Sequence, residues 1–290
     1  MARIAWITDP HLNFAIDRYR TFLYDSVHDA QPDAVLISGD IAESRELEGE
    51  LVELAATFGK PLYFVLGNHD YYRSSIAAVR DRVRTLVAQT PGLVYLSQAG
   101  VMELAPDVGL IGHDGWGDGR LGDFFGSDVQ LNDYVLIAEL AETRVALGND
   151  KVQLAKKLAR LGDEAAEHLE RLLPEALARY AHVVVLTHVP PFREACWYEG
   201  RPSDDNWAPH FSCRAVGDVL RAAMQAHPQR QMLVLCGHTH GAGRVKMLEN
   251  LEVMTGGAQY SRPVVSEVFE FPQWFTKREN IRGETGPAPA

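Results

Sequence analysis

The sequence predicts an α/β fold built on mixed sheets with helices on their outer faces. Short apolar runs alternate with amphipathic helical patterns in two separate parts of the chain, near residues 1–89 and 182–237. Each alternating part is followed by short apolar runs that leave no room for helices between them. At 290 residues and 46% hydrophobic, the chain can bury a large core.

The first half of the chain contains three predicted strand–helix units. Its predicted strands are RIAWIT, AVLIS and PLYFVLG, and its predicted helices lie near 17–30, 44–59 and 75–89. Ser44 and either Ser74 or Ser75 are suitable N-cap residues, and Gly59 is a suitable helix stop. The runs LVYLS, VMELA and VGLIG then predict a meander of strands. The alternating order places helices outside a sheet, and the meander makes that sheet mixed.

The second half begins with a charged helical segment at about 127–180, which predicts inserted or covering helices. Its amphipathic part, 151–180, predicts a helix that covers the sheet or forms a dimer. HVVVLTH, a long irregular loop 190–213, a helix near 214–226 and QMLVLCG then restore the strand–helix–strand order. The runs RVKML, LEVMT and VVSEVFEF predict a second meander. We therefore expect one domain over residues 1–271, and a disordered C-terminal tail over 272–290.

Charge and cysteine content narrow the class of protein. The formal net charge of −11 repels a polyanion, so nucleic acid is disfavoured as a partner unless bound metal supplies local positive charge. No stretch has the length and apolar character of a signal peptide or membrane span, so we expect a cytoplasmic protein. Three cysteines are too few for a disulfide framework; reduced thiols are expected, with a Cys196–Cys213 bridge as the alternative.

Polar side chains follow five of the predicted strands, at the point where each strand ends. They are Asp9 and His11, Asp40, Asn68 with His69 and Asp70, His188, and finally His238 and His240. Because ligands bind at the carboxyl edge of α/β sheets, we expect these residues to converge. Carboxylate, amide and imidazole donors suit zinc and other transition metals, and this set suffices for two ions with open positions.

The ordered series resembles one known family. It consists of Asp9-x-His11, Gly39-Asp40-x-x-Glu43, Gly67-Asn68-His69-Asp70, His188 and Gly237-His238-x-His240, and over roughly residues 3–270 it is similar to the calcineurin-like metallophosphoesterases. The resemblance implies a four-layer αββα sandwich of two mixed sheets with outer helices. It also implies one metal held by Asp9, His11, Asp40 and His240, and a second held by Asp40, Asn68, His188 and His238.

The resemblance further implies a dinuclear metal-dependent phosphoesterase that hydrolyses a small phosphomonoester or phosphodiester by attack of a metal-bridging hydroxide. His69 would protonate the leaving oxygen, and Asp70 would hydrogen-bond the other ring nitrogen of His69. The expected cofactors are two divalent ions among Mn, Fe, Zn, Co and Ni, with Mn favoured. A metal-dependent nuclease of the same fold and a non-catalytic scaffold are the alternatives.

Two loops supply candidate substrate contacts. The first, HDGWGDGRLGDFFG, contains His113 and Arg120, which could bind a phosphate; a glycine-rich surface turn is the alternative. The second follows His188 and contains Trp197 and Trp207, which could stack on a base or simply pack the loop onto the helical insert. The expected partner is a small phosphorylated substrate rather than a membrane, and the helix near 151–180 leaves a homo-oligomer open.

Overall fold

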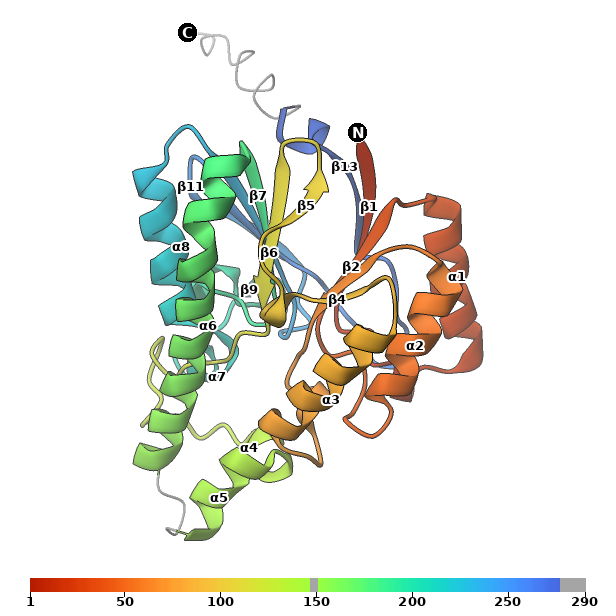
Figure 1. Ribbon diagram of the computed structural model, residues 1–290. Coiled ribbons are helices and arrows are strands. Elements are labelled where there is room, and N and C mark those ends of the chain that lie inside the picture. Colours follow the sequence, from red (N-terminus) through yellow and green to blue (C-terminus); the bar gives the residue numbers. More distant parts are fainter. Residues whose placement is uncertain (147–150, 277–290) are drawn as a thin grey trace, which may run out of the picture.

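The computed structural model describes residues 1–146 and 151–276 and contains two β-sheets that face each other between helices (Figure 1). The first sheet has β1 (Ala2–Ile7), β2 (Ala34–Ser38), β3 (Leu62–Val65), β4 (Leu93–Tyr95) and β13 (Glu267–Phe271), in the order β13-β1-β2-β3-β4. The second has β5 (Met102–Ala105), β6 (Val108–His113), β7 (His182–Thr187), β10 (Gln231–Cys236), β11 (Gly243–Leu248) and β12 (Leu251–Thr255), in the order β11-β12-β10-β7-β6-β5.

Helices cover the outer face of each sheet, which confirms the predicted four-layer αββα architecture. Figure 1 shows α1 (Asp17–Ala30), α2 (Leu47–Phe58) and α3 (Ile76–Gln89) beside the first sheet. On the other side, α6 (Lys151–Arg179) and α8 (Arg214–Ala226) lie against the second sheet and against each other. Both sheets mix parallel and antiparallel pairs, because β13, β5 and β11 run against their neighbours.

Three hydrophobic cores follow from the two-residue period of the strands. In β1, Ile4 and Trp6 belong to the core between the sheets, whereas Ala5 and Ile7 belong to the core under α1 and α2. In the second sheet, β7 and β10 alternate in the same way between the central core and a core under α6 and α8. Each central strand is therefore buried on both faces, which explains its continuous apolar sequence.

The first predicted meander is wrong. β4 pairs in parallel with β3 in the first sheet, whereas β5 and β6 form an antiparallel hairpin in the second. The helix α3 provides the crossover that a parallel β3–β4 pair requires. The short 3-10 helix Leu96–Gln98 then leads the chain from one sheet to the other.

The second predicted meander is also divided between the sheets. β11 and β12 form an antiparallel hairpin in the second sheet, and β13 pairs with β1 in the first. Residues 256–266 connect the two sheets, and we call them the crossing segment. Hydrogen bonds fix this segment at both ends, from the Ala258 N–H to the His240 carbonyl and from the Ser266 N–H to the Trp6 carbonyl.

The helix boundaries follow the predicted caps with one exception. Ser75 is the N-cap of α3 and its hydroxyl accepts the Ala78 N–H, while Gly59 ends α2 in a left-handed conformation. Ser44 does not cap α2, which begins at Leu47; its buried hydroxyl donates to the Tyr72 carbonyl instead. Here tertiary contact overrides the local capping preference.

The helical insert contains α4 (Asp133–Leu136), α5 (Ala138–Ala146) and α6. The apolar stripe of α6, which includes Leu158 and Leu169, is buried within the protein. The helix therefore covers this chain's own cores, as one of the two predictions had it. Among the helices in residues 1–146 and 151–276, none has the length and apolar character that a membrane span requires.

The predicted tail boundary at residue 272 lies too early. Phe275 is only 3% exposed and stacks on His182 and Phe271, because β13 delivers this turn to the open end of the central core. Residues 277–290, the rest of the predicted tail, lie outside the described part of the chain. The three cysteines are free, so the Cys196–Cys213 bridge does not form.

Candidate metal centre

The carboxyl ends of β1, β2, β3, β7 and β10 meet at one place between the two sheets. The first three strands are parallel neighbours in one sheet, and the last two are parallel neighbours in the other. β7 also contacts β2 and β3 across the sandwich. Polar residues that follow these strands are therefore brought together from both sheets, as the sequence predicts.

The backbone turns sharply where these polar residues leave the strands. Asp9, His11, Asp40, His238 and His240 all have positive φ, between 41° and 69°. A non-glycine residue in this left-handed region is uncommon, and such residues concentrate at functional sites. These turns bring Asp9 and His11 of one loop, and His238 and His240 of another, into the same cluster of side chains.

Two glycines make room for the converging carboxylates. A Cβ at Gly67 would overlap the side chain of Asp40, and a Cβ at Gly237 would overlap that of Asp9. Glycine is thus the residue that lets the loop backbones approach so closely. This explains the glycine that precedes both Asn68 and His238 in the sequence.

A first group of donors comes from three strand ends. It comprises Asp9, His11, Asp40 and His240, whose ligand atoms all lie within 4.8 Å of one another. The Nε2 atoms of His11 and His240 face each other at 3.0 Å. His11 Nε2 is also 3.7 Å from Asp40 Oδ2, and His240 Nε2 is 3.7 Å from Asp9 Oδ1.

A second group shares Asp40 with the first and adds His188 and His238. His188 Nδ1 donates to the Ser38 carbonyl at 2.8 Å, which leaves the lone pair of Nε2 facing Asp40 Oδ1 at 3.4 Å. The Asn68 side-chain oxygen lies 3.0 Å from the same Nε2. His238 Nε2 donates a hydrogen bond to a backbone carbonyl at 3.3 Å. Its Nδ1 therefore keeps the lone pair that could bind a metal ion.

The charge state of this cluster fits bound cations. Burial raises the pKa of Asp9 to about 7, and burial together with the charges of Asp9 and Asp70 raises that of Asp40 well above its usual value. Burial and repulsion from nearby histidines lower the pKa of His11 to about 2. Neutral imidazoles and crowded carboxylates are the forms that divalent ions bind and stabilise. The donor set therefore fits metal in each group.

His69 lies beside the donors rather than among them. The ring of His69 stands edge-on to that of His11, with centroids 4.7 Å apart. The backbone N–H of His69 donates to Asp40 Oδ1 at 2.8 Å. Burial lowers the pKa of the His69 ring to about 4. Its Nε2 is 3.4 Å from the hydroxyl of Tyr260, a residue of the crossing segment that sequence reasoning missed.

The predicted contact between Asp70 and His69 is wrong. The Asp70 carboxylate is fully buried and accepts three backbone N–H groups, from Ile41 and Ala42 at 2.8 and 2.9 Å and from Gly67 at 2.7 Å. These bonds join the loop that holds Asp40 to the loop that holds Asn68. Asp70 therefore positions both loops and leaves the tautomer of His69 unaffected.

His113 and Arg120 have partners other than a substrate. His113 Nδ1 accepts the Gly115 N–H at 3.1 Å, and its buried ring contacts that of His168. Burial lowers its pKa to about 3, so it is neutral and structural. The Arg120 guanidinium forms two hydrogen bonds, of 2.6 and 2.8 Å, with Asp163 on α6 instead of binding at the metal centre.

The two tryptophans of the loop 190–213 occupy different positions. This loop is not wholly irregular, because it contains β8 (Trp197–Tyr198), β9 (Arg201–Pro202) and α7 (Ala208–Phe211). Trp197 packs its ring on Gly243 at the start of β11. Trp207 is 46% exposed and contacts Phe211, which in turn packs on the ring of His238. Only Trp207 thus approaches a metal donor, through one intervening ring.

Further residues that orient the donors carry no signal in the sequence. Asp133 of α4 accepts the Asn68 side-chain N–H at 2.9 Å and the Tyr72 hydroxyl at 2.7 Å, which turns the amide oxygen toward His188. The carbonyl that fixes His238 belongs to His210 of α7, whose ring bonds to the hydroxyls of Ser127 and Tyr134. They lie outside the strand-end motifs, so only the folded arrangement identifies them. Buried partners of this kind tune metal ligands.

Comparisons with known proteins agree with this geometry. The family model for calcineurin-like phosphoesterases matches residues 2–242. Among solved structures, the phosphopantetheinyl hydrolase from Mycobacterium tuberculosis aligns at a TM-score of 0.61 and 15% identity, covering 90% of this chain and 91% of that chain. A dimetal phosphatase from Danio rerio aligns at 0.54 and 14% identity, covering 90% and 88%. A protein from Thermus thermophilus aligns at 0.51 and 15% identity, covering 90% of each chain.

These structural similarities are too distant in sequence to show more than the fold, and no match to a curated protein reaches significance. The family match, in contrast, spans most of the chain and every donor of both groups. The chain therefore belongs to the calcineurin-like phosphoesterase family and is a metal-dependent phosphoester hydrolase.

Proposed function

We propose that this protein hydrolyses a small phosphomonoester or phosphodiester at a dinuclear metal centre. The observation that carries the proposal is the position of Asp40, which belongs to both groups of donors and directs one carboxylate oxygen toward each. A carboxylate can offer an oxygen to each of two ions, which suits it to the shared position.

In this proposal, one ion would be held by Asp9, His11, Asp40 and His240, and the other by Asp40, Asn68, His188 and His238. Two divalent ions, when bound, would supply positive charge for the phosphate oxygens and Lewis acidity for the activation of water. Imidazole and oxygen donors accept Mn, Fe, Zn, Co or Ni, and we favour Mn.

The buried thiols are free, which supports a reducing compartment such as the cytoplasm.

His69 is proposed to protonate the leaving oxygen. Its ring is neutral in the free protein because burial lowers its pKa to about 4. An anionic ester bound beside it would raise that pKa, since an opposite charge favours the protonated ring. The nearby hydroxyl of Tyr260 offers His69 Nε2 a hydrogen-bond partner. The charges of the ester and of the two ions act on the ring in opposite directions, and in this proposal His69 carries the proton that passes to the leaving alcohol.

The proposal is tested with a panel of phosphate esters that includes an aryl monoester, an aryl diester and cyclic nucleotides, each assayed with every candidate metal. We expect hydrolysis of at least one class with Mn²⁺, loss of activity with a chelator, and loss in the Asp40→Ala variant. Asp29→Ala, which removes an exposed aspartate of α1, is the matched control and should remain active. Full activity of metal-free protein would falsify the proposal.

A further inference from the structure

Two hollows of similar size flank the candidate metal centre. The first, which we call the apolar hollow, has a volume of about 530 Å³ and is lined by Tyr19, Phe22, His240, Ala242, Gly257, Ala258, Gln259, Arg262 and Val264. The second, the acidic hollow, has a volume of about 610 Å³ and begins directly after His11, at Leu12, Asn13 and Phe14. Tyr260 lies between them, because its ring contacts both Phe14 and His240.

The apolar hollow adjoins the candidate metal centre at His240. His240, a donor of the first group, forms part of its wall. α1 contributes Tyr19 and Phe22, which lie three residues apart and thus on one face of the helix. The crossing segment contributes Arg262 and Val264. The side chains of Phe22 and Val264 are 56% and 41% exposed, and exposed apolar side chains gathered beside a reactive centre indicate a ligand surface.

The charges of the two hollows are opposite. The acidic hollow is lined by Asp17, Glu43, Glu46, Glu50 and Glu53, and its two arginines are already paired with these glutamates. The wall of the apolar hollow has no carboxylate. Its Arg262 lies over the ring of Tyr19 at 5.3 Å and forms no ion pair within the described residues. An anion is therefore repelled by one hollow and attracted by the other.

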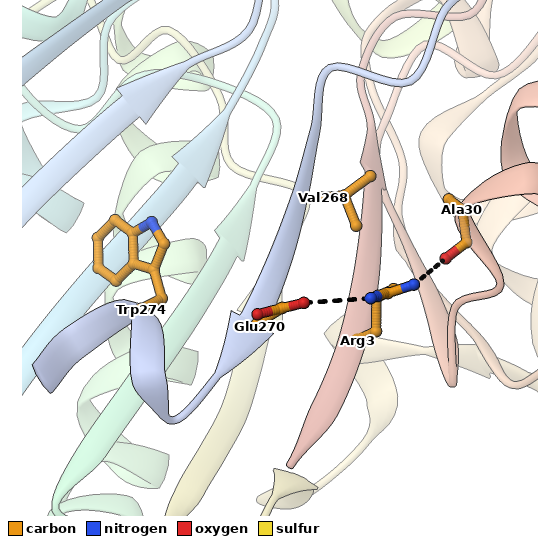
Figure 2. Close-up of a pocket in the computed structure, with 5 residues that line it drawn as sticks. All are labelled: Arg3, Ala30, Val268, Glu270 and Trp274. Carbon is orange, nitrogen blue, oxygen red and sulfur yellow. Dashed lines mark hydrogen bonds and ion pairs between the residues drawn. The ribbon is translucent and has the colours of Figure 1, made fainter. Parts of the chain in front are cut away.

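A third hollow can be set aside. Figure 2 shows this hollow, which has a volume of about 340 Å³. Arg3 in its wall lies near the start of β1, at the opposite end of the strand from Asp9. Its one arginine, Arg3, pairs with Glu270 at 3.1 Å and donates to the Ala30 carbonyl, as the dashed lines in Figure 2 show. The guanidinium is thus neutralised, and the hollow has no donor in common with the metal centre.

We propose that the apolar hollow binds the alcohol portion of the substrate, and that this portion carries an aromatic or apolar group together with a second anionic group. Tyr19, Phe22 and Val264 would contact the apolar group. Arg262 would bind the second anion, since a guanidinium forms strong charge-assisted hydrogen bonds with a carboxylate or phosphate. This assignment rests on the proposed function, because it places the scissile phosphate at the donors beside His240.

Two esters that differ only in the second anion test the assignment: 4-methylphenyl phosphate and 4-(carboxymethyl)phenyl phosphate, whose leaving groups have similar acidity. The wild-type protein with Mn²⁺ should show a kcat/KM about tenfold higher for the carboxylated ester. Arg262→Gln should abolish that preference. Its kcat/KM for 4-methylphenyl phosphate should stay within about twofold of the wild-type value. Phe22→Ser should raise KM about threefold for both esters. Arg160→Gln, which removes an exposed arginine of α6, should change nothing.

The corresponding phosphonates, titrated by calorimetry into the Mn²⁺-loaded protein, separate the two proposals. If no ester of the wider panel is hydrolysed, the proposed function is overturned, while weaker binding of the carboxylated phosphonate by Arg262→Gln would still support the hollow. If both variants retain the wild-type preference and affinity, the assignment of the hollow is overturned. The assignment is also overturned if Phe22→Ser leaves both KM values unchanged but alters the molar mass of the protein in solution, measured by light scattering. The apolar side chains would then contact a second copy of the chain.

Discussion

At the scale of single residues, the consecutive side chains Asn68, His69 and Asp70 have separate tasks. Asn68 turns its oxygen toward His188 because Asp133 and the Tyr72 hydroxyl accept hydrogen bonds from its amide nitrogen. His69 projects beside the donors toward Tyr260. Asp70 points the other way, into the backbone of two loops. One short stretch thus supplies a proposed ligand, a proposed proton donor and a positioning carboxylate.

Asn68→Ala and His69→Ala should therefore fail in different ways. We expect Asn68→Ala to weaken metal binding by about tenfold or more, because a ligand oxygen is lost. His69→Ala should retain metal and lower kcat by about 10²- to 10⁴-fold, the usual contribution of a general acid. Metal content by elemental analysis and steady-state kinetics distinguish the two. His28→Ala, an exposed histidine of α1, is the control. Loss of metal from His69→Ala would contradict the roles.

Asp70→Asn should destabilise the fold and weaken metal binding together. An asparagine can accept N–H groups only at its oxygen, so its amide nitrogen would face the Gly67 N–H without a bond. Leaving a buried donor unsatisfied costs about 1–3 kcal/mol of unfolding free energy. Urea unfolding of the metal-free protein measures this cost. If Asp70→Asn left the stability unchanged and altered the pH profile of kcat, the result would instead support the predicted contact between Asp70 and His69.

At this scale the sequence predicts which polar residues converge, but it does not predict the residues that hold them in place. The donors stand in compact motifs at strand ends, such as Gly237-His238-x-His240, where residue type alone signals metal chemistry. The support from Asp133 arises from an insert helix far away in sequence. Arg120 matched the chemistry of a phosphate ligand, yet its nearest partner, Asp163, comes from α6, which is distant in sequence. Such partners are set by tertiary packing, which a local motif does not encode.

At the scale of elements, the sequence predicts the bounds of helices and strands better than their pairing. The expected helices near 17–30 and 214–226 coincide with α1 and α8, since amphipathic periodicity and caps are local properties. The division of both meanders between the two sheets was not predicted. The sheet that each strand joins depends on the core into which its side chains pack. Short apolar runs have similar sequences, so the sequence does not distinguish between the two sheets.

Phe275 tests the element that continues the chain beyond β13. Its ring is buried against Phe271 and His182 at the end of the central core. We expect Phe275→Ala to lower the free energy of unfolding by about 3–5 kcal/mol, as for other large-to-small changes in a core. Phe125→Ala, at a position that is 61% exposed, is the matched control. Equal stabilities of the two variants in urea would show that this turn contributes nothing to the fold.

At the scale of the whole molecule, the candidate metal centre joins the two halves of the sandwich. Asp9, His11, Asp40 and Asn68 follow strands of the first sheet, whereas His188, His238 and His240 follow strands of the second. Each of the two donor groups takes residues from both sheets. Bound ions would thus act as cross-links between the sheets in addition to their chemical role.

Metal should consequently stabilise the folded protein. A ligand that binds only the native state adds about 2.7 kcal/mol at 100 times its dissociation constant, which raises the melting temperature of a protein of this size by a few degrees. We expect such a rise with Mn²⁺, its reversal by chelator, and a smaller rise for Asp40→Ala than for Asp29→Ala. Calorimetric melting measures all three. A melting temperature that is independent of Mn²⁺ in the wild-type protein would contradict the proposed centre.

The spacing of the donors also has a consequence during synthesis. Asp9 leaves the ribosome long before His238 and His240, and β1 acquires its partner β13 later still. A nascent chain that lacks these segments offers only an incomplete set of ligands. In the proposed centre, the two groups of ligands are complete only after His238 and His240 have been translated. Metal would therefore bind only to a nearly full-length chain.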